Sequence, residues 1–327
     1  MEYSNFVEGD VELKLVKNIE EGGRPPEVIV KSLSEYVDLV CSVTERWRDF
    51  PLSENRDTFP GERAPWFRGV KCHSYPLEPR LLREKERKKF VRKVDSIDIS
   101  LSKVERYMMT RFKSGVRPFR GILDGFDINS IEGMDLLIMM QHYGLPTRLL
   151  DWSKNAYTAL YFSVKNENRK GDCSVWILNP RNLVKNARIV DAIDSLEKES
   201  VNQYLEFDEK TSNNDQLKIP LPVIPSPIDL RVTAQHSRFT LHTETGGLES
   251  HFVRLMAKNH KHCSLIKIRI PYSCKPKIHR DLRLFGTTEM DIMPGVDTLA
   301  NEINDRMSFG MEDINKFVVN NEANKSN

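Results

Sequence analysis

The sequence predicts an α+β fold, with a helix-rich first half around a mixed or antiparallel sheet. Apolar residues recur at helical spacing over residues 32–48 and 131–142, whereas they alternate cleanly at Ser264–Ile270, which is typical of a strand. Strand-like runs are scattered through both halves of the chain. With 327 residues the chain is long enough to bury a sizeable core, so we expect one large domain.

The N-terminal segments are short and distinct. Val11–Val16 alternates between apolar and polar residues and predicts a strand or a short arm, which a Gly- and Pro-containing stretch ends. Ser32–Arg48 predicts an amphipathic helix, with Ser32 or Ser34 placed to cap it. Trp66–Val70 predicts a short buried strand.

The segment 79–120 is dense in basic residues interleaved with apolar ones. A solvated helix face explains this pattern, and a surface facing phosphates or nucleic acid is the alternative. The first basic cluster comprises Arg80, Arg83, Lys85, Arg87, Lys88, Lys89, Arg92 and Lys93.

The remaining chain alternates between predicted helices, strands and connectors. The apolar helix 131–142 stops at Gly144-Leu145-Pro146, and the prolines of 219–227 favour an extended connector. The other expected elements are helices at 155–164, 276–284 and 299–306 and strands at 173–178 and 264–270. The expected division is an N-terminal arm (1–30), a domain (31–306) and a polar tail (307–327).

Composition narrows the function classes. The formal net charge is +2, so a strongly electrostatic nucleic-acid binder is not the default expectation. No apolar run reaches the roughly 20 residues of a membrane span, and the start of the chain lacks a signal pattern. The five cysteines are odd in number and widely spaced, as expected of reduced thiols. We therefore expect a cytoplasmic protein without a membrane partner.

The segment Met139–Ser163 concentrates polar side chains between two apolar elements. Burying such groups unpaired costs about 1–3 kcal/mol each. This segment is therefore either a polar network that holds a loop or a functional site.

Several motifs together resemble the FRG-domain family, which is found in bacteria and phages. They are Trp66–Gly69, Pro79–Leu81, the long string His142–Ser153, Ala159–Phe162, and downstream blocks at 231–240 and 284–300. The resemblance departs from the family pattern at Gln235–Phe239 and at Asp291–Gly295.

The order of these motifs is also similar to ADP-ribosyltransferases of the Arg-Ser-Glu kind. This resemblance implies an effector in bacterial toxin or antiviral defence, with NAD as co-substrate and a protein or nucleic acid as acceptor. An inhibitor or antitoxin is left open as a further partner. The implied catalytic residues are Glu289, His142 and Arg68, and the implied NAD contacts are Arg68, Tyr143, Thr147, Arg148, Trp152, Ser153 and Tyr161.

Each of these residues also has a structural explanation. The Arg68 guanidinium is suited to bind backbone carbonyls or Asp151 and so to anchor its strand. Arg148 and Asp151, three positions apart, are spaced to form a buried ion pair that fixes the loop. His142 is suited to a helix C-terminus. Further structural explanations are Trp152 in the core, Ser153 as a helix cap and Glu289 on the surface.

The sequence gives less support to three other kinds of function. One is a non-catalytic module in which 142–153 binds a nucleotide or partner and the basic 80–93 segment touches nucleic acid. A nuclease or other hydrolase built on His142 and the nearby acids is weaker. A hydrolase triad of Ser153, His142 and Asp151 lacks the GxSxG motif that would support it. The absence of a phosphate-binding glycine motif argues against an ATPase, a kinase or a dinucleotide dehydrogenase. His251, His260, His262 and Cys263 lack a second ligand pair, so we assign no metal site.

Overall fold

A computed structural model of the chain describes residues 25–48, 64–90, 101–122, 131–165, 170–180, 183, 204–206, 219–225, 234–243, 247–250 and 265–304. The predicted α+β class is confirmed. The helices are α2 (Leu33–Arg48), α3 (Glu84–Phe90), α4 (Leu101–Gly115), α5 (Gly133–His142), α6 (Ala156–Val164), α11 (Lys275–Leu284) and α12 (Glu289–Ile292). The 3-10 helices are η1 (Arg80–Leu82), η2 (Arg117–Ile122) and η4 (Tyr272–Cys274).

The described strands form one seven-stranded mixed sheet in the order β1-β7-β4-β2-β3-β6-β5. Only β1 and β7 pair in parallel among these strands. The strands are β1 (Glu27–Ile29), β2 (Trp66–Val70), β3 (Leu149–Ser153), β4 (Cys173–Leu178), β5 (Leu221–Val223), β6 (Ser237–Leu241) and β7 (Leu265–Ile270).

The sheet divides between β2 and β3. These strands share the single registered pair Phe67–Ser153, whereas β2 pairs with β4 along its whole length and β3 pairs with β6 along its whole length. The half-sheet β1-β7-β4-β2 therefore meets the half-sheet β3-β6-β5 at this one pair of residues. Beyond it, no further registered pair joins the described residues of β2 and β3.

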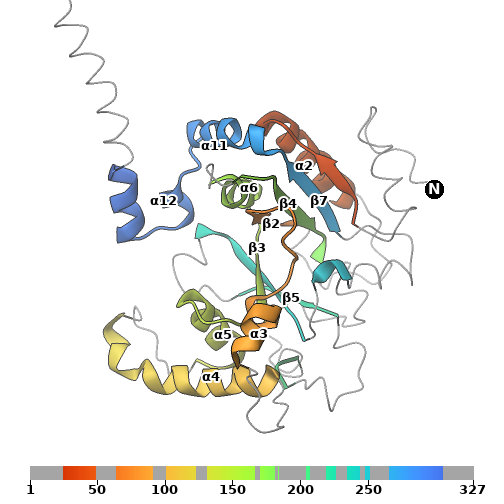
Figure 1. The fold of residues 1–327 in the computed structure, drawn as a ribbon. Helices are drawn as coiled ribbons and strands as arrows, with labels where there is room; N and C mark the ends of the chain where they lie inside the picture. The colour runs from red at the N-terminus through yellow and green to blue at the C-terminus, as the bar shows by residue number, and fades with distance from the viewer. Residues whose placement is uncertain are drawn as a thin grey trace, which may run out of the picture.

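Each half-sheet has its own helices (Figure 1). Helices α2, α6 and α11 pack on the first half-sheet in a core that includes Tyr36, Phe67 and Leu160. Helices α4 and α5 pack on the second half-sheet in a core that includes Leu137 and Leu149. A third core, with Trp66, Trp152 and Trp176 among its members, contains residues of both half-sheets.

The helix starts follow local capping chemistry. Ser32 Oγ accepts the backbone N–H of Glu35 at 3.2 Å, which confirms Ser32 as the cap of α2. Asn155 caps α6, because its Oδ1 accepts the N–H groups of Tyr157 and Thr158 at 2.9 and 3.3 Å. The cap that sequence reasoning assigned to Ser153 was therefore placed two residues early.

Gly69 brings β2 close to α6. A Cβ atom built on Gly69 would lie 1.9 Å from the backbone oxygen of Ala159. Only glycine permits this approach. The Gly of the Trp66–Gly69 motif therefore has a packing role next to Arg68.

Two expected elements differ from the structure. The proline-rich connector 219–227 contains strand β5, which is tolerated because β5 lies at the edge of the sheet, where Pro222 needs no full ladder. The last described helix runs over 296–304 and starts earlier than the expected 299. The expected strand at 11–16 and the tail 307–327 lie outside the described residues. None of the helices in the described ranges combines the length and apolar character that a membrane crossing requires.

Candidate functional site

Arg68 and Asp151 meet where the two half-sheets part. The Arg68 guanidinium donates from Nη1 to the Asp151 backbone oxygen at 2.5 Å and lies 3.4 Å from carboxylate Oδ2. Arg68 belongs to β2 and Asp151 to β3, so this contact spans the division of the sheet. It matches the structural explanation that the sequence offered for Arg68.

Gln141 and Thr147 extend this contact into a hydrogen-bonded chain. Gln141 Nε2 donates to Asp151 Oδ1, and Thr147 Oγ1 donates to Gln141 Oε1. Thr147 is 1 % exposed and also accepts the N–H of Leu149 at 3.3 Å. We call Arg68, Gln141, Thr147 and Asp151 the Asp151 cluster. Arg68 and Gln141 each donate to one oxygen of the Asp151 carboxylate and thereby orient it.

The loop between α5 and β3 is fixed by residues of η1. Arg80 Nη1 donates to the Gly144 carbonyl at 2.9 Å, and the Leu81 N–H donates to the Thr147 carbonyl at 3.2 Å. Gly144 has φ +85°, a left-handed conformation that suits glycine. The Pro79–Leu81 motif therefore holds the long His142–Ser153 motif in place.

The cluster retains free binding capacity. The Asp151 side chain is 55 % exposed, whereas that of Arg68 is 18 % exposed. Arg68 Nε is buried and has no hydrogen-bond acceptor within the described part of the chain. Burial lowers the pKa of Arg68, and the negative charge of Asp151 opposes this shift. A partly desolvated guanidinium with a free donor beside an accessible carboxylate is suited to an anionic or polar ligand.

Arg148 does not pair with Asp151, which corrects the expected local ion pair. Its Nη2 lies 2.7 Å from Glu105 Oε2 on α4, and its backbone N–H donates to Glu105 Oε1 at 3.1 Å. Arg148 is 1 % exposed and also donates to the backbone oxygens of Tyr204 and Leu205. These contacts tie β3 to α4.

Three further candidates lie in the interior. Trp152 is 3 % exposed and donates from Nε1 to Thr240 Oγ1 at 3.0 Å. Ser153 donates to the Gln235 carbonyl at 2.6 Å and accepts the N–H of Asn155. Tyr161 is 5 % exposed and packs in the core beneath α11, with its ring 5.5 Å from that of His279.

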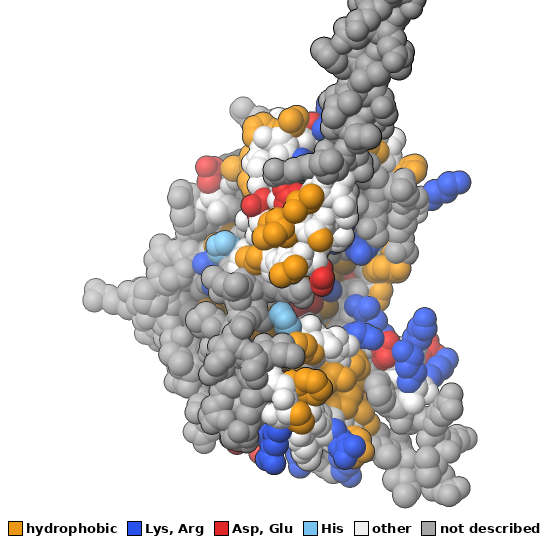
Figure 2. All heavy atoms as spheres, turned by 90° about the vertical axis from the view of Figure 1, so that its left-hand side faces the viewer, with side chains coloured by type: hydrophobic (Ala, Val, Ile, Leu, Met, Phe, Trp, Pro, Cys, Tyr) orange, Lys and Arg blue, Asp and Glu red, His pale blue; other side chains and the backbone are white. Residues whose placement is uncertain are grey.

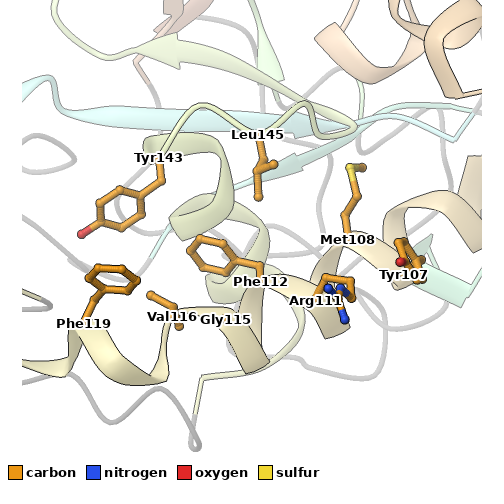
Figure 3. Close-up of a pocket in the computed structure, with 9 residues that line it drawn as sticks. All are labelled: Tyr107, Met108, Arg111, Phe112, Gly115, Val116, Phe119, Tyr143 and Leu145. Carbon is orange, nitrogen blue, oxygen red and sulfur yellow. The ribbon is translucent and has the colours of Figure 1, made fainter.

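His142 and Tyr143 end α5. The two rings meet edge to face with centroids 5.0 Å apart, and His142 is the last residue of the helix, as the structural explanation expected. Tyr143 is 49 % exposed and lines a pocket of about 630 Å³ between this loop and α4 (Figure 3).

Glu289 lies at the start of α12. Its Oε1 accepts a hydrogen bond from Lys165 Nζ at 3.0 Å, and Ile292 of the same helix packs in the core shared by α6 and α11. No ion pair or hydrogen bond between described residues joins Glu289 to Arg68.

Three residues of the basic cluster, Arg80, Lys88 and Lys89, pair with carboxylates of α3. Lys88 lies 2.6 Å from Glu84, and Glu86 accepts from Lys89 at 3.1 Å and lies 3.5 Å from Arg80. The hydrogen bond from Lys89 lowers the pKa of Glu86. This arrangement matches the solvated-helix explanation for these residues.

The candidate metal ligands at 251–263 lie outside the described residues. Among the residues with a described placement, no group of three or more His, Cys, Asp or Glu side chains gathers as a metal site.

Sequence reasoning did not assign Gln141 a role and considered Asp151 only as an ion-pair or hydrolase residue. One signal was available. Gln141 precedes His142 at the end of an otherwise apolar helix, and a polar residue there needs a partner. Which partner it has depends on the folding of α5 against β3.

The family model of the FRG domain matches residues 63–172. This range begins just before β2 and ends just before β4, so it contains the whole Asp151 cluster and the η1 anchor. The blocks at 231–240 and 284–300, and Glu289, lie outside this match. No curated protein and no solved structure matches the chain.

Proposed function

We propose that the FRG domain forms the catalytic site of an NAD-dependent ADP-ribosyltransferase-like effector. Its acceptor is a protein or a nucleic acid, and its setting is bacterial toxin action or antiviral defence. The observation that supports this proposal best is the Arg68–Asp151 contact at the division of the sheet, where a guanidinium and an accessible carboxylate lie together.

Arg68 has the chemistry to bind the diphosphate of NAD. Its Nη1 is engaged with Asp151, and its buried Nε lacks an acceptor among the described residues. A guanidinium presents planar, paired donors that suit phosphate oxygens, and such charge-assisted hydrogen bonds are roughly twice as strong as neutral ones. A bound phosphate would supply the missing acceptor.

Asp151 has the chemistry to stabilise the reacting ribose. In the transfer, the bond from nicotinamide to C1′ of the ribose breaks, nicotinamide leaves as a neutral molecule, and a nucleophile of the acceptor forms the new bond to C1′. The proton of the nucleophile passes to a carboxylate or to solvent. A carboxylate close to C1′ stabilises the positive charge that develops there. Gln141 and Arg68 hold Asp151 in one orientation.

Asp151 therefore takes the role that the sequence order suggested for Glu289. Glu289 is neutralised by Lys165 at 3.0 Å, whereas the Asp151 carboxylate remains half exposed beside Arg68. Thr147 positions Gln141 through their hydrogen bond and does not itself contact NAD. Arg148, Trp152 and Ser153 hold the surrounding strands, and Tyr161 holds the α6 core.

Transfer of label from NAD tests the proposal. Purified full-length protein is incubated with NAD labelled on the adenylate, together with bacterial lysate, and released nicotinamide is measured in parallel. We expect label on a macromolecule from the unchanged protein, and a loss of roughly tenfold or more with Arg68→Gln or Asp151→Asn.

Two control variants separate the alternatives. Arg280→Gln removes an exposed arginine of α11 and should leave transfer unchanged. Glu289→Gln should retain most activity if Asp151 is the carboxylate, and should abolish activity if Glu289 is. Absence of both transfer and nicotinamide release from the unchanged protein would refute the proposal.

A further inference from the structure

The pocket between α4 and the end of α5 has no role in the proposed transfer. We infer that it binds single-stranded nucleic acid, with one or more bases stacked on its aromatic side chains and the phosphates along the basic edge of α4. Its volume of about 630 Å³ is within the range of ligand-binding pockets. We call this pocket and the exposed side of α4 and η2 the α4 groove.

Exposed aromatic rings form the walls of the α4 groove. Figure 3 shows Tyr143 projecting from the loop above, and Phe112 and Phe119 projecting from α4 and η2 below. Phe119 is 56 % exposed and Tyr143 is 49 % exposed, whereas the Phe112 ring packs against that of Tyr143 at 6.1 Å. Large exposed rings gathered on one face are typical of a binding site, and every nucleic-acid base has a flat face that can stack on them.

Several basic side chains of α4, and Arg117 at the start of η2, have no acidic partner among the described residues. Lys103, Arg106, Arg111 and Arg117 are exposed, and none of them forms an ion pair with another described residue. Arg111 also lines the pocket. Figure 2 shows apolar side chains gathered over the lower part of the molecule, where α4 lies, with Lys and Arg side chains at their edge.

The acidic residue of α4 does not neutralise this surface. Glu105 is 2 % exposed and its carboxylate is bound by Arg148 in the interior. Helix α3 differs, because two of its lysines, Lys88 and Lys89, pair with Glu84 and Glu86. On α4, unpaired positive charge therefore lies beside the exposed rings that line the pocket.

This combination favours a strand with accessible bases over other occupants. A double helix hides its base faces, so it would engage the basic residues but not the rings. An anionic membrane surface would engage the charges and the apolar side chains together. The concave shape of the pocket fits an inserted base better than a flat lipid surface.

Fluorescence anisotropy with the full-length protein and no NAD tests the inference independently of ADP-ribosyl transfer. The probes are labelled oligo-uridine and oligo-thymidine of about 12 nucleotides and a duplex of the same length. We expect both single strands to bind more tightly than the duplex. Affinity should fall between about 50 and 200 mM salt, because bound cations are released from the strand.

The variants assign the binding to the α4 groove. Tyr143→Ala and Phe119→Ala should each weaken binding roughly fivefold to a hundredfold, as expected for a lost base stack, and Phe119→Trp should retain it. Arg111→Gln should reduce the slope of log affinity against log salt by about 0.7. Phe285→Ala and Arg280→Gln, which change exposed residues of the α11 region, should leave both quantities unchanged.

Three results would overturn the inference. The first is equal affinity for duplex and single strands, which would indicate general electrostatic attraction. The second is binding that Tyr143→Ala and Phe119→Ala leave intact. The third is absence of oligonucleotide binding, whether or not the protein sediments with vesicles containing anionic phosphatidylserine. Because Tyr143 and Phe119 are exposed, their alanine variants should keep the circular dichroism spectrum of the unchanged protein.

Discussion

Glu105 binds Arg148 in the interior, with the carboxylate 2.7 Å from Nη2 and 3.1 Å from the backbone nitrogen of Arg148. The two residues are 2 % and 1 % exposed. The pair joins α4, which carries the exposed basic side chains, to β3, which carries Asp151. One buried ion pair thus connects both proposed binding surfaces.

We expect Glu105→Gln to destabilise the protein by about 3–5 kcal/mol, because it leaves a buried guanidinium without its charge partner. Urea unfolding, followed by circular dichroism, measures this change. Glu132→Gln is the matched control, since Glu132 is 81 % exposed in its ion pair with Lys113 and should cost at most about 1 kcal/mol. Equal midpoints for Glu105→Gln and the unchanged protein would contradict the structural role of the pair.

Gly69→Ala should destabilise the protein by about 1–3 kcal/mol or more, because the new methyl group would overlap the backbone of α6 at Ala159. Thermal unfolding measures the effect. Gly115→Ala offers the comparison, since a Cβ there meets no atom within 4 Å, and we expect it to stabilise by at most about 1 kcal/mol. If both variants behaved alike, β2 would not approach α6 as closely as described.

His73 should make stability fall in mild acid. Burial, followed by the charge of Lys267, lowers the pKa of His73 below its ordinary value, although Glu27 and Asp172 oppose the shift. Its ring contacts Ser174 Oγ at 2.8 Å and Glu27 Oε2 at 3.4 Å. The unfolded chain therefore binds the proton more readily, so this stability is complete above about pH 6.5 and is lost as pH falls below it.

Urea unfolding of the unchanged protein and of His73→Gln at about pH 8 and about pH 5 measures this contribution. We expect the unchanged protein to lose more stability on acidification than the variant does. An identical loss in both proteins would show that another group titrates.

Cys173 should resist thiol reagents. Burial raises its pKa to about 11, so almost none of it is thiolate at neutral pH. Cys41, which is exposed, should react first with iodoacetamide when the modified peptides are followed by mass spectrometry. Reaction of both cysteines at one rate in the folded protein would contradict the burial of β4.

The elements with strong local patterns could be predicted from the sequence, whereas their long-range pairing could not. Ser32–Arg48 and Ser264–Ile270 carry clear periodicity, and α2 and β7 lie there. Strand β5 was missed because its prolines are typical of a connector, and only its edge position permits them.

In the candidate site, too, the sequence indicated important residues but not their long-range partners. The motif Trp66–Gly69 indicated that Arg68 matters, and its contact with Asp151 was among the expected explanations. Arg148 was paired with Asp151 because the two are close in sequence, but its partner Glu105 lies 43 positions away. Gln141 has a role only because α5 packs beside β3, which no local pattern specifies.

Calorimetric titration of NAD into the full-length protein tests the central claim, that Arg68 and Asp151 form a site for this dinucleotide. We predict that the unchanged protein and Arg280→Gln bind NAD with the same Kd, and that Arg68→Gln weakens binding roughly tenfold or more. The absence of binding heat with the unchanged protein, or an unchanged Kd for Arg68→Gln, would contradict the account.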